Sequence, residues 1–299
     1  MKGKVLVLFV SLLSLLIFIS GHGYSDTPIQ VDNGQPELNE ILKKCSAYCE
    51  KLSTSVLYFV CQEKVEELTY VYGSTTRIDS ANTAISEVRN RDLGVQEWRD
   101  RRRLQSKNKY VYDYQLMRQD NKIKEVRQLL EENGKKLKPK YSELDNLRFK
   151  HEKIIMGPIA LLNDFWQHYH DYRIVKRVKY RGDQVIILDV TPKPEYILNH
   201  LYGKVWVKIS DGSVVKIEWS QTGIEGYDML EAMAEAMQME PRINLCTEYD
   251  YEKNGLRFPS KFTLEETYVG AKRRKAIKSK KVVEYEGYKF FTVETEIKY

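Results

Sequence analysis

The segment YGKVWVKISDGSVVKIEW, residues 202–219, contains two alternating stretches on either side of Asp211-Gly212. Apolar and polar residues alternate in both stretches, as they do in strands that have one buried and one solvated face. An Asp-Gly pair supplies the positive backbone φ angles that a tight two-residue turn requires. The segment therefore predicts an antiparallel β-hairpin with one apolar face.

Four more pairs of predicted strands flank comparable turn residues elsewhere in the chain. With an alternating segment at 56–70, the five hairpins predict about eleven antiparallel strands. The strand pairs are 109–118 with 122–132, 172–180 with 184–191, 203–210 with 213–220, 243–253 with 256–268, and 281–285 with 288–299, the last turning at Glu286-Gly287.

The predicted sheet has one apolar face, and its other face carries charges of both signs. A membrane-spanning barrel would instead turn an apolar band toward lipid, where a charge costs about 2–4 kcal/mol at the midplane. We therefore expect the charged face to lie in water and the apolar face to need a cover.

A predicted helix at 157–168 can cover part of the apolar face. Pro158 suits its first turn, and Ile159, Leu162 and Phe165 fall on one stripe. A second predicted helix, 228–238, can be capped by Asp228.

The second helix carries methionines at every fourth position, Met229, Met233 and Met237. Unbranched thioether side chains adapt to many apolar partners. The stripe therefore either fills a core or forms a deformable lid over an apolar ligand, and the pattern leaves both interpretations open.

Residues 1–25 differ from the rest of the chain. Lys2 and Lys4 precede the apolar run Val5–Ile19, which leads into small and polar residues. This order is typical of a secretory signal peptide, and an uncleaved anchor helix is the alternative. We expect a polar linker at 26–36 and a single domain at 37–299.

The four cysteines are compatible with disulfides in an exported chain. Cys45 and Cys49 lie on an apolar stripe of a predicted helix at 38–52, Cys61 follows, and Cys246 lies far downstream. Four cysteines allow three full pairings. We favour one bridge from the helix to Cys61, with Cys49 ahead of Cys45 as the partner. A Cys/His metal site would need paired short spacings, which this chain lacks. Because Cys45 is the first cysteine, no lipobox is predicted.

Composition and charge favour a globular protein that does not bind nucleic acid. The 299 residues are 42% hydrophobic and 30% charged, with 48 basic and 42 acidic residues. Such a mixed surface differs from the one-signed surface of nucleic-acid-binding proteins. Residues 74–108 form a predicted basic insertion, and its run at 97–109 is interpreted as solvated surface rather than as a site for an anionic partner.

Motifs of catalysis are missing from the sequence. It contains no GxSxG, GxxxxGK[ST], GxGxxG or HExxH. His168 and His170 form the one histidine cluster, but two ligands do not complete a metal site. We interpret this segment as a polar helix-to-strand junction and predict no enzyme, metal or cofactor.

Three motifs together resemble a known family. They are LDVTPK (188–193), the hairpin 202–219 and NGLRFPSKFTLEETY (254–268). The combination resembles the outer-membrane lipoprotein-sorting protein superfamily, which includes the LolA and LolB carriers, and in particular its uncharacterised exported bacterial members. The resemblance implies an α+β fold, an incomplete antiparallel (half) β-barrel whose concave apolar face is covered by helices and holds acyl chains. It implies no catalytic residues.

The predicted function is that of an exported, non-enzymatic binding protein or carrier for an amphiphile. Lipid or an acylated protein would be its partner, in the periplasm or outside the cell, with transient membrane contact. The alternative is an envelope interaction module that binds a protein and fills its own core, and a third hypothesis is a hydrolase or metalloenzyme using His168 and His170. Which alternating set points inward is left open; the candidate lining is Ile174, Val178, Val205, Val207, Ile217, Trp219, Phe262, Leu264, Val293 and Ile297, with Met229, Met233 and Met237 as the lid.

Overall fold

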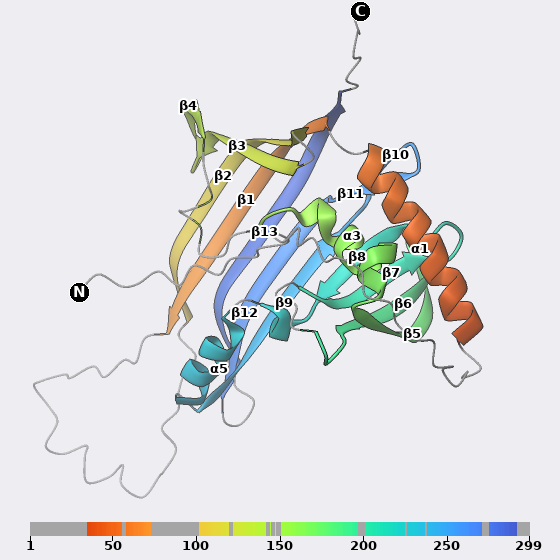
Figure 1. The fold of residues 1–299 in the computed structure, drawn as a ribbon. Coiled ribbons are helices and arrows are strands. Elements are labelled where there is room, and N and C mark those ends of the chain that lie inside the picture. The colour runs from red at the N-terminus through yellow and green to blue at the C-terminus, as the bar shows by residue number, and fades with distance from the viewer. Residues whose placement is uncertain are drawn as a thin grey trace, which may run out of the picture.

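A computed structural model describes residues 35–55, 58–72, 102–119, 122–141, 144, 147, 151–196, 201–224, 226–236, 238–270 and 275–291. These residues form an eleven-stranded antiparallel sheet that does not close into a barrel (Figure 1). Its strand order is β4-β3-β2-β1-β13-β12-β9-β8-β7-β6-β5, so β4 and β5 are the two edge strands, and β10 and β11 form a separate ribbon. The strands are β1 Tyr58–Tyr72, β2 Arg102–Gln119, β3 Lys122–Glu132, β4 Lys135–Tyr141, β5 His170–Tyr180, β6 Asp183–Pro192, β7 Gly203–Lys208, β8 Val214–Trp219, β9 Met239–Glu248, β10 Tyr251–Lys253, β11 Leu256–Phe258, β12 Lys261–Gly270 and β13 Lys275–Phe290. The helices are α1 Gln35–Ser55, η1 Ile154–Met156, α3 Gly157–Leu162, α4 Asp164–Gln167, η2 Gln221–Gly223 and α5 Tyr227–Ala236.

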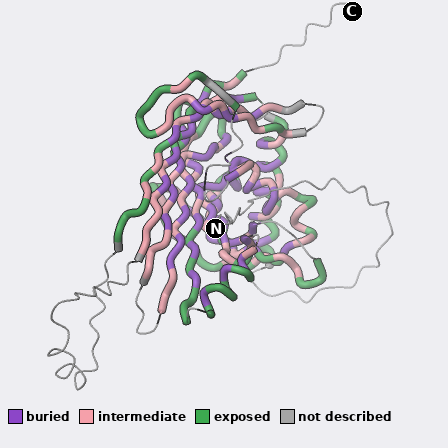
Figure 2. Tube along the Cα trace, turned by 90° about the vertical axis from the view of Figure 1, so that its left-hand side faces the viewer, coloured by how far each residue is buried: buried purple, intermediate pink, exposed green. Residues whose placement is uncertain are grey.

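The sheet curves strongly, and its concave side holds the core. Buried positions alternate with more exposed ones along the strands (Figure 2), as expected for side chains that point to opposite faces in turn. Helices α1, α3 and α4 lie over the part of the sheet formed by β5 to β8 (Figure 1). Lys44 Nζ of α1 donates to the carbonyl of Ile209 at 3.3 Å, and Tyr48 Oη accepts from the Arg257 amide at 3.1 Å. The predicted α+β half-barrel with covering helices is therefore confirmed.

The end of the sheet differs from the predicted hairpin at 281–299. Residues 275–290 form one continuous strand, β13, which pairs with β1 and β12. Gly287 has a φ of +68°, but it serves a bulge opposite Val60 and Gln62, where the register shifts, instead of a turn. Both features need a left-handed residue, so the dipeptide could not distinguish them.

A strand that the sequence did not predict keeps the number of strands in the sheet at eleven. This strand, β4, follows a turn at Asn133 and Gly134, both with positive φ. Its sequence KKLKPKY resembles a loop, but lysine and proline are tolerated at a sheet edge.

The predicted basic insertion at 74–108 is wrong in its C-terminal part, because β2 begins at Arg102. Lys107 and Lys109 each lie 3.2 Å from Glu66 on the neighbouring strand β1. Glu66 therefore offsets the charge of these two lysines. The first part of the insertion, at 74–101, lies outside the described residues, as do the predicted signal peptide 1–25 and the linker up to residue 34.

The predicted helix 157–168 is divided at Asn163, so its stripe is only partly correct. Asn163 Oδ1 accepts from the Phe165 amide at 3.0 Å and starts the separate helix α4. Leu162 is buried, whereas Phe165 is 57% exposed. The break rotates α4 relative to α3, which removes Phe165 from the buried stripe.

The methionine stripe lies on the solvent side of α5, which excludes core filling for its described members. Met229 and Met233 are 52% and 54% exposed. Tyr227, Leu230 and Ala234 form the buried side of this helix. Met237 lies outside the described residues.

The predicted disulfide is wrong, because all four cysteines are free thiols. Cys49 Sγ donates to the carbonyl of Pro158 at 3.4 Å, which joins α1 to α3. Cys61 lies on β1 and interacts with Tyr288 instead of a second cysteine. Burial raises the pKa of Cys45 to about 12 and that of Cys246 to about 11, so the thiolates needed for oxidation are scarce near neutral pH.

We expect thiol titration of the unreduced protein to find four free thiols after denaturation. In the native state Cys246, which is half-buried, should react first, because Cys45, Cys49 and Cys61 are at most 2% exposed. The count is obtained by mass spectrometry after alkylation. If only two cysteines of the denatured protein were alkylated, the other two would form a disulfide, and the predicted bridge would be supported after all.

No helix among the described residues is both long enough and apolar enough to cross a membrane.

Candidate functional site

The concave face changes character from one side of the sheet to the other. Beneath the helices, inward side chains of β6 to β8 are apolar, and Val205, Val207 and Ile217 are fully buried. Toward β1, β2 and β13, apolar and charged rows alternate. Val65 pairs with Val283 in one row, and Glu67 pairs with Lys281 in the next. Leu264 of β12 continues the charged row beside Lys281, so this half of the face is amphipathic.

A buried charged cluster forms the polar part of this half. We define it as Glu63, Glu67, Glu125, Arg127, His151 and Lys281. Arg127 binds Glu63 through two hydrogen bonds, from Nε to Oε2 at 2.7 Å and from Nη2 to Oε1 at 3.2 Å. His151 Nε2 lies 2.9 Å from Glu63 Oε1. Glu63 and His151 are both 0% exposed, so the carboxylate is held entirely by protein groups.

The second carboxylate, Glu125, fixes the chain that carries His151. Its Oε1 accepts from the Lys153 amide at 2.6 Å and from Tyr114 Oη at 2.6 Å. Its Oε2 accepts from Arg127 Nη1 at 3.1 Å, and Arg127 Nη2 also donates to the carbonyl of His151 at 3.2 Å. Arg127 therefore joins two carboxylates and a backbone carbonyl.

The protonation states in the cluster follow from this geometry. Burial alone would raise the pKa of Glu63, but the charge of Arg127 and the hydrogen bonds from Arg127 and His151 together outweigh burial and hold that pKa well below its ordinary value. Burial lowers the pKa of His151 to about 3, with Lys281 adding to the effect. A neutral His151 beside an ionised Glu63 carries its proton on Nε2, because the carboxylate can only accept.

Lys281 is 1% exposed at the centre of the sheet. Burial lowers its pKa to about 7, while Glu67 and Glu63 act in the opposite direction. The cluster therefore contains a cation that loses its proton near physiological pH.

We expect the free energy of unfolding to rise between pH 7 and pH 8. In this window the native protein binds fewer protons at Lys281 than the unfolded chain, whose lysine keeps its ordinary pKa of 10.5, so stability rises with pH by about 1 kcal/mol per unit. Above this pH range the buried thiols act in the opposite direction. Their pKa values are raised in the folded protein, so the unfolded chain loses these protons first and becomes favoured. Urea unfolding at three pH values measures the slope. Lys281→Met should flatten it, and an equal slope in both proteins would contradict the assignment.

The predicted lining residues lie in different parts of the structure. Phe262 and Leu264 lie beside the buried charged cluster: Phe262 stacks on His151 with ring centroids 5.9 Å apart. Met229 and Met233 are exposed on α5, and Val178 and Ile174 are partly buried on β5. Four further positions lie in the core beneath the helices, namely Val205, Val207, Ile217 and Trp219. The last three, Met237, Val293 and Ile297, lie outside the described residues.

Sequence analysis missed the buried charged cluster. One signal was present, since the inward positions of β1 run Phe59, Cys61, Glu63, Val65 and Glu67. Two carboxylates in phase with core residues are unusual, because buried charges need partners. Arg127 and His151 carried no such signal in their own segments.

The two histidines considered for a metal lie at a helix-to-strand junction, as predicted. His168 is exposed at the end of α4, whereas His170 is buried with Nδ1 2.8 Å from the carbonyl of Trp166. Across the part of the chain that the structure describes, no group of three His, Cys, Asp or Glu residues is placed to hold a metal ion.

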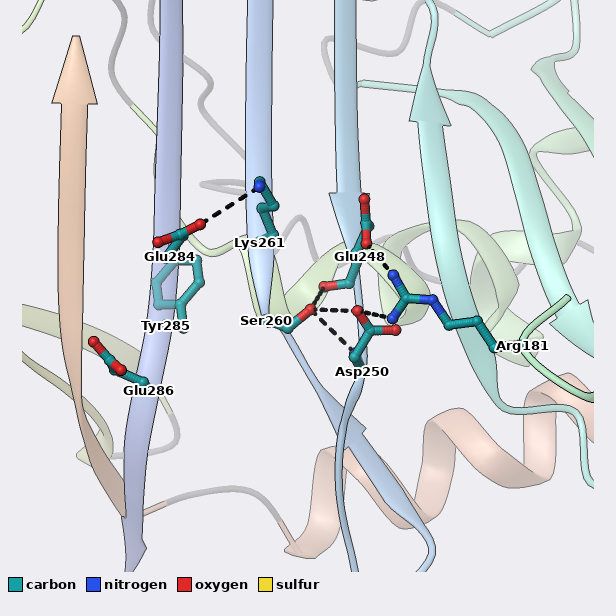
Figure 3. Close-up of a pocket in the computed structure, with 8 residues that line it drawn as sticks. All are labelled: Arg181, Glu248, Asp250, Ser260, Lys261, Glu284, Tyr285 and Glu286. Atoms are coloured by element: carbon teal, nitrogen blue, oxygen red, sulfur yellow. Dashed lines mark hydrogen bonds and ion pairs between the residues drawn. The ribbon is translucent and has the colours of Figure 1, made fainter.

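A polar cleft of about 530 Å³ lies on the opposite, convex face (Figure 3). Arg181 reaches across it and donates to Glu248 Oε2 at 2.7 Å, and it also pairs with Asp250. Lys261 lies 3.4 Å from Glu284 on the next strand. The cations and carboxylates of this cleft are thus largely paired with one another.

The comparisons with known proteins concern the fold. No family model matches the chain, and no curated protein matches its sequence. Solved structures do align with it. A LolA superfamily protein from Nitrosomonas europaea has a TM-score of 0.31 at 11% identity, covering 86% of this chain and 94% of its own.

Two further structures are similar over most of their length. A DUF1329 family protein from Desulfovibrio piger has a TM-score of 0.36 at 8% identity, with 89% of this chain and 96% of its own covered. A protein described as an outer membrane lipoprotein-sorting protein domain, from Vibrio parahaemolyticus, has a TM-score of 0.36 at 13% identity, with 88% and 96% covered. Identities of 8–13% at TM-scores of 0.31–0.36 establish no shared activity.

Proposed function

We propose that the protein is an exported, non-enzymatic binding protein or carrier for an amphiphile, either a lipid or the acyl chains of a lipoprotein. The amphiphile would lie along the concave face, with its chain on the apolar rows and its polar end at the buried charged cluster. The sequence motifs that resemble lipoprotein-sorting proteins support this proposal, and so does the basic and apolar order of residues 1–25.

One observation carries the proposal: charged and apolar rows alternate on the concave face, where Val65, Val283 and Lys281 are at most 2% exposed, so an amphiphile reaches them only when a covering element opens. A buried ion pair adds little net stability compared with apolar residues of similar volume, because desolvation offsets its attraction. The group of Glu63, Arg127 and Lys281 is therefore better explained by recognition of a polar group than by stability.

The apolar rows provide the binding free energy. Val65, Val283 and Phe262 are at most 2% exposed, so they must be uncovered before a chain can pack on them. Each methylene that then moves from water onto these residues contributes about 0.8 kcal/mol. Twelve methylenes would contribute roughly 10 kcal/mol before ordering costs, so release requires an element that opens. We assign this role to α5, whose solvent-facing Met229 and Met233 offer a deformable apolar contact to an amphiphile that arrives from outside.

Native mass spectrometry of the protein purified from its own envelope is expected to detect a bound acyl-chain ligand. Delipidated protein should take up a lysophospholipid. Leu264→Gln should weaken this uptake about tenfold, since it places an amide on an apolar part of the concave face and costs about 1.4 kcal/mol of binding.

Glu265→Gln is the matched control, because Glu265 lies on the same strand with its side chain on the opposite face. Its affinity for the lysophospholipid should equal that of the unchanged protein. A protein that purifies without ligand and ignores every acyl probe would exclude the carrier and leave an interaction module with a self-filled core.

A further inference from the structure

One ring nitrogen of His151 has no hydrogen-bond partner among the residues that the structure describes. Its Nε2 is bonded to Glu63 Oε1 at 2.9 Å, but Nδ1 is buried and makes no hydrogen bond to any of them. Leaving a buried acceptor unpaired costs about 1–3 kcal/mol. An orphaned polar atom of this kind, 0% exposed and inside the buried charged cluster, points to a group that binds there.

The chemistry of Nδ1 is set by the residue on the other side of the ring. Glu63 is ionised and already accepts two hydrogen bonds from Arg127, so the Nε2–H of a neutral imidazole donates a further hydrogen bond to it. Nδ1 is then a lone pair, which can only accept. Whatever satisfies it must donate an N–H or O–H.

The surrounding charges disfavour an anionic partner. Among the described residues of this part of the concave face, the buried carboxylates are Glu63, Glu67, Glu125 and Glu266, and the buried cations are Arg127 and Lys281. An additional carboxylate would enter a region where negative groups already outnumber positive ones, and it has no proton to give to Nδ1.

Resting on the proposed function, we propose that the concave face selects an amphiphile whose polar end is a hydrogen-bond donor, a hydroxyl or an ammonium, and that His151 Nδ1 is the acceptor that recognises it. A carboxylate of equal chain length is rejected. A site built around a buried acceptor discriminates strongly against a ligand that leaves the acceptor unpaired.

The test compares three ligands with the same fourteen-carbon chain on delipidated full-length protein. They are monomyristoylglycerol, tetradecylamine and myristate, each titrated below its micelle concentration by calorimetry. The hydroxyl and ammonium ligands should each bind at least about tenfold tighter than myristate. Comparing the affinities of monomyristoylglycerol and tetradecylamine shows whether the site prefers a hydroxyl or an ammonium group.

The matched variants are His151→Gln and Glu265→Gln. Glutamine places an amide N–H near the position of Nε2, so it keeps the bond to Glu63 and removes only the Nδ1 acceptor. In His151→Gln the preference for donors over myristate should fall to about threefold or less, with the affinity for myristate unchanged. Glu265→Gln should keep the full preference, and near-UV circular dichroism establishes that both variants are folded.

The outcomes separate the two proposals. If none of the three ligands binds, the carrier function fails, and the inference fails with it. If all three bind equally, or myristate binds best, the function stands and the inference is overturned. A donor preference that survives in His151→Gln would likewise overturn the assignment of His151 as the acceptor.

Discussion

Replacing Arg127 by methionine is expected to lower the free energy of unfolding by about 3–5 kcal/mol. The substitution keeps much of the volume but removes two hydrogen bonds from Glu63, which is 0% exposed. An uncompensated buried carboxylate must then either stay charged at high cost or take up a proton. Urea unfolding measures the loss.

Two controls isolate the buried pair. Arg173 lies 2.7 Å from Asp189 but is 77% exposed at its side chain, so Arg173→Met should cost at most about 1 kcal/mol. The double variant Arg127→Met with Glu63→Gln should recover part of the loss, because neither charge remains. A loss below 1 kcal/mol for Arg127→Met alone would show that Glu63 is not buried as an ion.

Substituting alanine for Gly212 is expected to cost about 2–5 kcal/mol. Gly212 has a φ of +73° in the turn between β7 and β8, which costs an L-residue about 1–2 kcal/mol. A Cβ there would also lie 2.6 Å from the carbonyl oxygen of Lys44, and forcing the turn away from α1 adds about 1–3 kcal/mol. Thermal and urea unfolding give the size of the effect.

Gly182→Ala is the matched control for this substitution. Gly182 has a similar positive φ of +94°, but nothing lies within 4 Å of its Cβ position. It should therefore lose only the backbone part, about 1–2 kcal/mol. Equal losses at the two glycines would contradict the close packing of α1 on the turn.

The hairpins around β5 to β8 could be predicted because their information is local. Asp211-Gly212 and the alternation on either side fix both the turn and the apolar face within 18 residues. The same kind of local signal failed at Glu286-Gly287, because a left-handed glycine serves a bulge as well as a turn. Pairing with β1 decides between them, and that pairing joins distant parts of the chain.

The buried charged cluster was even harder to predict, because its residues come from distant parts of the sequence. Glu63 contacts Arg127, which is 64 positions away in the sequence, and His151, which is 88 positions away. Arg127 and His151 are ordinary in their own segments. The register of β1, β2 and β3 brings Arg127 to Glu63, and the segment before η1 brings His151 to the same carboxylate. The apolar alternants, in contrast, are visible from period-two patterning alone.

The two open edges of the sheet have a consequence for self-association. An unpaired edge strand is a template onto which a second copy can add, the first step of amyloid-like stacking. At one edge β4 carries four lysines and Pro139 in seven residues, so a like strand would meet repulsion and a missing donor. At the other edge β5 is interrupted by a bulge near Val175, and Arg177 pairs with Glu37 of α1. The fold thus leaves its sheet unclosed while giving fibril growth no flat, neutral end on which to begin.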